Sequence, residues 1–343
     1  MTIYKNNYCQ NSPQSPSRSD IEVEKLIFYV NDPSKHDLIK TFLEDKKFLR
    51  RQLKNLTTFR DYRFDRSYSI LKALSASEFT KLLIQADAVK VCLNILSGEH
   101  YSSRKTRLIF QLLTDFAAEE PELIRKSGII SRYTGIFSQM TPEELKENQL
   151  NVNQFLWLVF YLCRVSILKV EDLTILHPLW NRMFTEGFYT PHICASVYFL
   201  LKGRDPEVRD FIGKNYLKHL VNNLDLDGFY IIKIGVISDF RLLAPYFNKE
   251  ILELGVIPKL TTIMIDLNLA SMRSVQVFHL SLRYLEMAAT DEELFAQHLT
   301  LSLIHRIEEK AAMIFEDEVV EYAFQLAAKF REIFAMKRAI ASK

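Results

Sequence analysis

The chain has 343 residues, with 44 Lys and Arg against 42 Asp and Glu, and a formal net charge of +2. This near balance gives no global electrostatic case for nucleic acid, so nucleic acid is not expected as a partner. With 48% hydrophobic and 25% charged residues and only 9 glycines and 10 prolines, the composition is that of a globular protein and disfavours a turn-rich β fold.

Residues 1–20 are polar and lack the apolar run of a signal peptide, which predicts a disordered tail. Two Ser-Pro pairs, at Ser12 and Ser15, are either proline-directed phosphorylation sites or ordinary parts of that tail. The longest uninterrupted apolar run, Phe155–Cys163, is well short of a membrane span. The expected location is the cytoplasm, with exchange with the nucleus left open.

Residues 21–66 predict capping helices that carry a basic segment. Leucines at 49, 53 and 56 define one face of a helix, and the opposite face is cationic. The segment is either the solvated face of a capping helix or a docking site for an acidic partner. Its candidate docking residues are Lys46, Lys47, Arg50, Arg51 and Lys54.

Across residues 67–310 one sequence pattern recurs: an apolar helical stretch, a turn-forming residue, then a second apolar stretch. The turn positions follow one another at intervals of 38 to 49 residues, and they are Asp87, Gly128, His177, Asn215, Gly255 and His298. A pair or triplet of amphipathic helices cannot cover its own apolar face, so such a period predicts stacked units in an α-solenoid.

Long buried helices are predicted between the copies of this pattern, because the intervening stretches are apolar on most sides and free of proline. They comprise residues 106–119, 153–166, 192–203, 230–243 and 275–289. The β-branched stretch from Ile231 to Ile237 is the one most compatible with a strand. Residues 311–343 predict a closing helix that is acidic at its start and basic at its end.

Two of the turns resemble armadillo repeats, in which a short helix ends at glycine and the next begins G-x-I-P-x-L. Gly255 to Leu260 fits this pattern, and Gly128-Ile129-Ile130 fits without the proline. Glycine accepts the positive φ of such a turn, and proline suits the first helical turn. The resemblance implies an all-α, right-handed α-solenoid of about six armadillo-like repeats with capping helices, whose long third helices line a concave groove.

The importin-α family, which has this fold, holds a basic peptide with a ladder of Trp and Asn in its groove. The positions that match the asparagines are Asp115, Cys163, Lys202, Asp239 and Glu286, and those that match the tryptophans are Gln111, Val159, Tyr198, Gly235 and Leu282. None keeps the family residue, so the ladder is broken. The candidate groove residues are therefore the charged ones: Asp115, Lys202, Asp239 and Glu286.

No catalytic motif stands out. The four cysteines form no C-x-x-C pair, and no phosphate-binding glycine pattern or H-E-x-x-H is present, so no enzyme activity, cofactor or metal is expected. Trp157 and Trp180 are expected in the core. The expected function is a scaffold or adaptor that binds a protein or peptide along the groove. The alternatives are a divergent importin-α-like transport adaptor and a nucleotide-exchange cofactor of a heat-shock chaperone.

Overall fold

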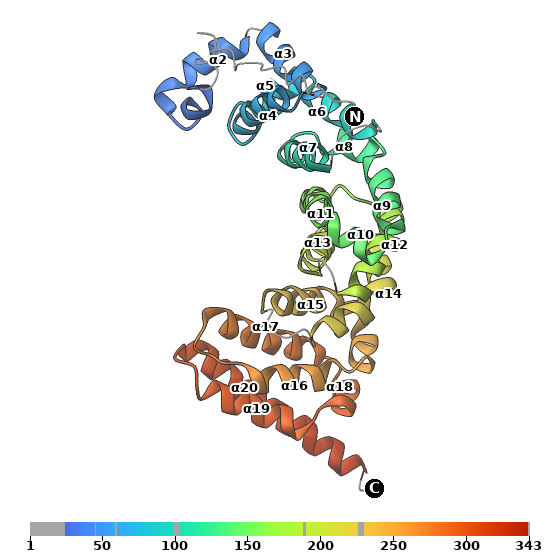
Figure 1. Cartoon of the computed structure of the whole chain (residues 1–343). Helices are drawn as coiled ribbons and strands as arrows, with labels where there is room; N and C mark the ends of the chain where they lie inside the picture. The colour runs from blue at the N-terminus through green and yellow to red at the C-terminus, as the bar shows by residue number, and fades with distance from the viewer. Residues whose placement is uncertain are drawn as a thin grey trace, which may run out of the picture. The chain divides into compact units, whose positions relative to one another are not determined.

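The computed structural model describes residues 25–44, 46–58, 60–98, 103–187, 190–225 and 230–341. Throughout these ranges the regular structure is helical and no strand occurs, so the prediction of an all-α fold is confirmed (Figure 1). The expected tail, residues 1–20, lies outside the described residues. The chain divides into two compact units, Met1–Glu119 and Glu120–Lys343, each described by itself below.

All regular structure in the described residues of unit 1 is helical, and its helices after residue 32 are a short 3-10 helix and α-helices. They are η1 Pro33–Lys35, α2 His36–Glu44, α3 Lys46–Leu56, α4 Asp61–Ser75, α5 Thr80–Gln85, α6 Ala88–Ser97 and α7 Ser103–Phe116. Helix α4 lies between α3 and α7, and α6 also packs on α7. The predicted apolar face of α3 is buried, with Leu49 and Leu53 each 3% exposed and Leu56 fully buried.

Unit 2 begins with shorter helices and ends with the longest one. Its helices are α8 Pro121–Lys126, α9 Ile129–Gln139, α10 Pro142–Glu147, α11 Gln149–Arg164, α12 Val170–Glu186, α13 Thr190–Lys202, α14 Pro206–Asn223, α15 Tyr230–Glu253, α16 Val256–Asp266, α17 Met272–Ala288, α18 Glu292–His298, α19 Leu301–Ala311 and α20 Asp317–Ala341. The stretch from Ile231 to Ile237, which could have been a strand, lies inside α15.

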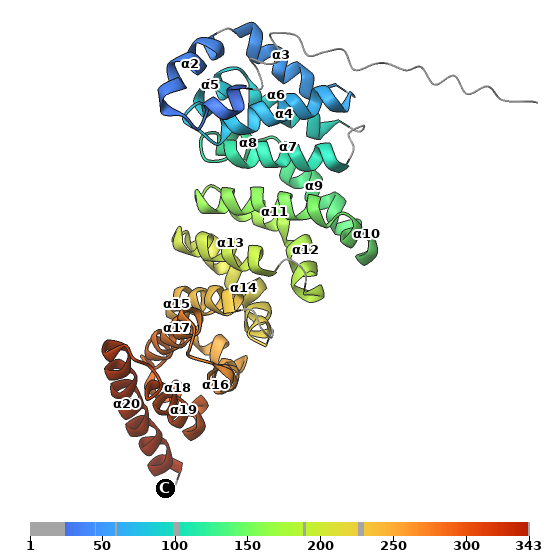
Figure 2. The ribbon, with the colours of Figure 1, turned by 60° about the vertical axis from the view of Figure 1, so that its left-hand side comes forward.

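The helices of unit 2 stack in two rows. In the first row, α11 packs on α13, α13 on α15, α15 on α17 and α17 on α20, as the successive layers of Figure 2 show. In the second row, α9 packs on α12 and α12 on α14, and further along the chain α16 packs on α19. The core lies between the rows and includes the fully buried Trp180 and Tyr216.

Three of the predicted turns are left-handed residues at a helix start: Asp87 (φ 63°), Gly128 (φ 79°) and Gly255 (φ 83°). A Cβ atom at either glycine would meet nothing within 4 Å, so the positive φ and not the space explains why glycine suits these positions. A further predicted turn, His298, is the last residue of helix α18.

The turns predicted at His177 and Asn215 are wrong, because α12 and α14 run through both positions. The Asn215 amide donates to the Phe211 carbonyl one turn earlier in the same helix, at 2.8 Å. The His177 ring lies 3.0 Å from the Tyr216 hydroxyl and so joins α12 to α14. Neither position has a glycine that would release the chain into a left-handed turn.

Three cationic side chains donate hydrogen bonds to carbonyls at the C-terminal ends of helices about one repeat earlier in the chain. Lys105 donates to the Thr58 carbonyl, Arg182 to the Ser138 carbonyl and Lys310 to the Leu267 carbonyl, across 47, 44 and 43 residues. Carbonyls at a helix C-terminus lack intrahelical partners and carry partial negative charge, so a buried cation satisfies both needs. We call these three side chains the capping cations.

Candidate interaction surface

The carboxylate of the first predicted groove residue, Asp115, already has hydrogen-bond partners within unit 1. It lies on α7 and accepts two hydrogen bonds from the Lys72 ammonium of α4, at 2.7 and 2.6 Å, and a third from the Ser75 hydroxyl. Its side chain is 18% exposed. Most of its capacity to accept hydrogen bonds therefore joins α4 to α7.

Asp239 lies in the core of unit 2, not on a groove. It is fully buried on α15, and neither carboxylate oxygen has a hydrogen-bond partner among the described residues. Burial raises its pKa well above the usual range, because desolvation penalises the charged form. Burial and then the neighbouring Asp239 likewise raise the pKa of the Cys194 thiol. The expectation that Asp239 lines a groove is therefore wrong.

The remaining two groove candidates are exposed but differ in their surroundings. Glu286 on α17 accepts a hydrogen bond from the Tyr322 hydroxyl at 2.6 Å and lies 3.5 Å from the Arg283 guanidinium. Lys202, at the end of α13, has no carboxylate within salt-bridge distance among the described residues. Within unit 2, the structure thus does not join Lys202, Asp239 and Glu286 into one charged groove.

Partly exposed aromatic side chains from α11 and α13 instead form a continuous surface, which we call the aromatic face. Its members are Trp157, Phe160, Tyr161, His192, Tyr198 and Phe199. The ring centroid of Trp157 lies 4.9 Å from that of His192 and 5.3 Å from that of Phe160. Phe160 lies 5.5 Å from Phe199, which joins the two helices. Burial lowers the pKa of His192, which favours its neutral ring.

The local sequence explains why these rings reach the surface. In α11, positions 157, 160, 161 and 164 recur at helical spacing on one side, whereas Val159 and Cys163 are fully buried on the other. Trp180 is in the core as expected, but Trp157 is 37% exposed, contrary to expectation. The sequence signal for this was Arg164, which lies at helical spacing from positions 157, 160 and 161, because arginine is mostly exposed in folded proteins.

A hollow of about 510 Å³ lies beside the aromatic face, between the last turns of α11 and α13. It is lined by Phe160, Arg164, Ser166, Phe199 and Lys202. The turn residue Ser166 has a left-handed backbone with φ 55°. It packs against Gly203, where an added Cβ would lie 3.2 Å from the Ser166 hydroxyl. Glycine at 203 therefore allows the two turns to approach.

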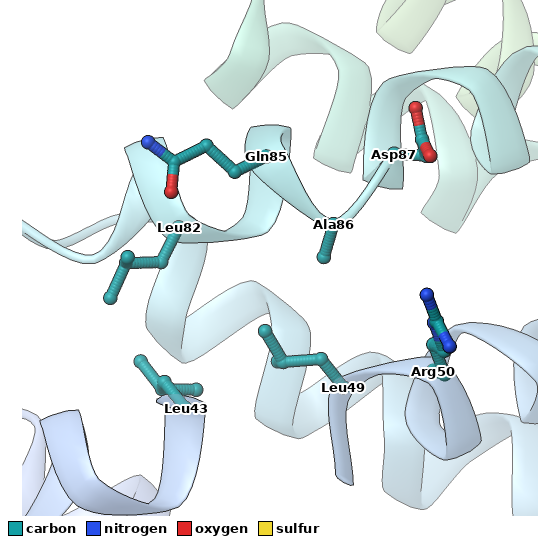
Figure 3. A pocket seen from close by; sticks show the side chains of 7 residues that line it. All are labelled: Leu43, Leu49, Arg50, Leu82, Gln85, Ala86 and Asp87. Atoms are coloured by element: carbon teal, nitrogen blue, oxygen red, sulfur yellow. The ribbon is translucent and has the colours of Figure 1, made fainter. Parts of the chain in front are cut away.

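The basic segment of unit 1 is part of the fold. Lys47, Arg50, Arg51 and Lys54 are exposed on α3, opposite its buried leucines, while the side chain of Lys46 lies outside the described residues. Arg50 also lines a second hollow, of about 320 Å³, shown in Figure 3. Its apolar walls are Leu43, Leu49, Leu82 and Ala86, and Figure 3 shows Arg50 and Asp87 at the same end.

The parts of the chain that the structure describes contain neither a metal-binding cluster nor an exposed thiol. There, no group of three or more His, Cys, Asp or Glu is placed to hold a metal ion. Cys92, Cys163 and Cys194 are buried free thiols, and burial raises their pKa values. A search of the helices in the described ranges finds none with the length and apolarity that a bilayer crossing needs.

No protein-family model matches the chain, and no curated protein matches it either. Among solved structures it is similar to the crystal structure of an engineered protein, with a TM-score of 0.62 and 12% sequence identity. The similarity covers 92% of this chain and 82% of the engineered one. At this identity the likeness shows a similar fold and carries no information on function.

Proposed function

We propose that this protein is a non-enzymatic scaffold, built as an armadillo-like α-solenoid, that binds a protein partner through the aromatic face. Three observations support the solenoid. The helices of unit 2 stack in two rows, the left-handed turns at Asp87 and Gly128 lie one repeat apart, and the capping cations reach back about one repeat.

The observation that carries the binding proposal is the exposure of Trp157 within a cluster of five other partly exposed rings. Contiguous apolar surface rimmed by polar groups marks interaction sites, and Trp, Tyr and Arg dominate the energetics of interfaces. The centroids of neighbouring rings already lie 4.9 to 6.2 Å apart, so little side-chain freedom is lost when a partner covers them.

The importin-α-like alternative has less support than the scaffold. A receptor for basic peptides needs accessible acidic or amide side chains, whereas Asp239 is buried and Asp115 is paired with Lys72. The cations that border the aromatic face would also repel a basic peptide. The chaperone-cofactor alternative stays a prediction, since no described contact bears on it.

The test is affinity capture of partners from cell extract, quantified by mass spectrometry, with the wild type and two variants. Trp157→Ser alters the aromatic face, whereas Ile136→Ser alters a similarly exposed residue, at 38% against 37%, on α9 in the other row. We expect a partner that the wild type and Ile136→Ser retain and that Trp157→Ser loses. Equal retention by all three proteins would refute binding through the aromatic face. Thermal melts of both variants check that folding is intact.

A further inference from the structure

The hollow between the last turns of α11 and α13 combines aromatic walls with a cationic rim. Its walls are the rings of Phe160 and Phe199, which meet edge to face at 5.5 Å. Its rim carries two exposed cations, Arg164 and Lys202, one from each helix. A ligand that fills it must therefore present an apolar group and a negative charge side by side.

Within the ranges that the structure describes, the two cations have no acidic partner. Among the described residues, no carboxylate lies within salt-bridge distance of Arg164 or Lys202, and the Arg164 guanidinium lies 5.8 Å from the Tyr161 ring centroid. Other arginines of unit 2 do have partners, as in the Arg182–Glu186 contact at 2.7 Å. Arginine presents a planar fork of donors that matches a carboxylate, and lysine adds a further donor.

The local charge favours an anion with a single negative charge. Each helix C-terminus carries about half a negative charge, so the ends of α11 and α13 together contribute about −1 against +2 from the cations. The net charge of about +1 matches one carboxylate. A phosphate would find no backbone N–H donors from the helix ends here, because the C-termini of α11 and α13 present carbonyls, whereas a helix N-terminus presents N–H groups.

We propose that this hollow binds the carboxylate of an Asp or Glu in the partner, with an adjacent aromatic or aliphatic residue of the partner packed on Phe160 and Phe199. The Ser166 hydroxyl lies on the same rim and can donate a further hydrogen bond. This inference rests on the proposed function and specifies the sequence that the aromatic face recognises. The partner segment is therefore acidic and apolar, the opposite of the basic cargo expected from the importin-α resemblance.

The experiment selects binders from a displayed library of random dodecapeptides with the full-length protein. The wild type is compared with Arg164→Gln/Lys202→Gln and with a matched control, Arg132→Gln/Lys146→Gln, which removes two exposed cations from α9 and α10. Selected peptides should be enriched in Asp or Glu next to an aromatic or aliphatic residue. For a synthesised peptide from this set, we expect Kd to rise at least tenfold with the first double variant or with its own acidic residue changed to the amide. The control should change Kd less than twofold.

Several outcomes would overturn the inference: no binder, binders without acidic enrichment, or equal affinity for the first double variant. Tighter binding of a phosphoserine version of the peptide would overturn the choice of a carboxylate. Trp157→Ser separates this inference from the proposed function. Peptides that show no acidic preference but bind Trp157→Ser more weakly refute the carboxylate site and leave the aromatic face. Peptides that show no acidic preference and bind Trp157→Ser as tightly as wild type refute both. Thermal melts confirm that each variant is folded.

Discussion

The fully buried Asp239 makes a sharp prediction about pH and stability. An unfolded aspartate has a pKa of about 3.9, and burial raises the pKa of Asp239 well above this range in the folded state. Between the two values the folded protein holds one proton more than the unfolded chain at this residue. The free energy of unfolding therefore falls by about 1.4 kcal/mol per pH unit as the pH rises through this window.

Asp239→Asn removes the titration while keeping the shape of the side chain. Between pH 5 and pH 6 we expect the variant to become more stable relative to wild type by about 1.4 kcal/mol, provided that the pH stays below the raised pKa. The assay is urea unfolding followed by tryptophan fluorescence. Both Trp157 and Trp180 lie in unit 2, so the signal reports the unit that holds Asp239.

The control is Asp266→Asn, which neutralises an exposed carboxylate on α16 of the same unit. Its stability relative to wild type should stay nearly constant from pH 5 to pH 6. If the curves of Asp239→Asn and wild type run parallel over this range, Asp239 is not held protonated in the folded state. The burial argument would then be refuted.

Three further predictions concern single contacts. Lys310→Met leaves the buried Leu267 carbonyl without its 2.8 Å donor and should cost about 1–3 kcal/mol, measured by urea unfolding; an unchanged midpoint would contradict this role. Gly255→Ala should cost about 1–2 kcal/mol through its left-handed backbone alone, since no atom crowds the added methyl, and a neutral effect would show that the turn relaxes. A double-mutant cycle on Lys72 and Asp115 should give a coupling of about 1 kcal/mol that weakens with added salt; no coupling would mean the pair is solvated.

The turns and the helices were predictable from the sequence where local chemistry alone fixes the backbone. Gly128 and Gly255 adopt the left-handed conformation expected of them, because glycine has no Cβ to oppose it. His177 and Asn215 carry no such local signal. Their placement as turns rested on the period alone, and the helices continue because the apolar positions on either side keep helical spacing.

The site was less predictable than the fold, because exposure depends on neighbours that the sequence does not place. Matching to a known groove put Asp239 on the surface, but a shift of one residue turns a helix side chain by about 100 degrees. The same uncertainty assigned Trp157 to the core, although it shares the exposed side of α11 with Arg164. The pairing of Asp115 with Lys72 across 43 residues could not be found without the packing of α4 on α7.

The capping cations impose a rule on how this chain can change length. Lys105, Arg182 and Lys310 each donate a hydrogen bond to a carbonyl at a helix end 43 to 47 residues earlier in the chain. An internal deletion or duplication that falls between a cation and its carbonyls brings the wrong helix end opposite it, and a truncation just before the cation exposes that end. Shortened versions of the protein should therefore end beyond a capping cation, and natural gain or loss of units should be found where no such pair is separated.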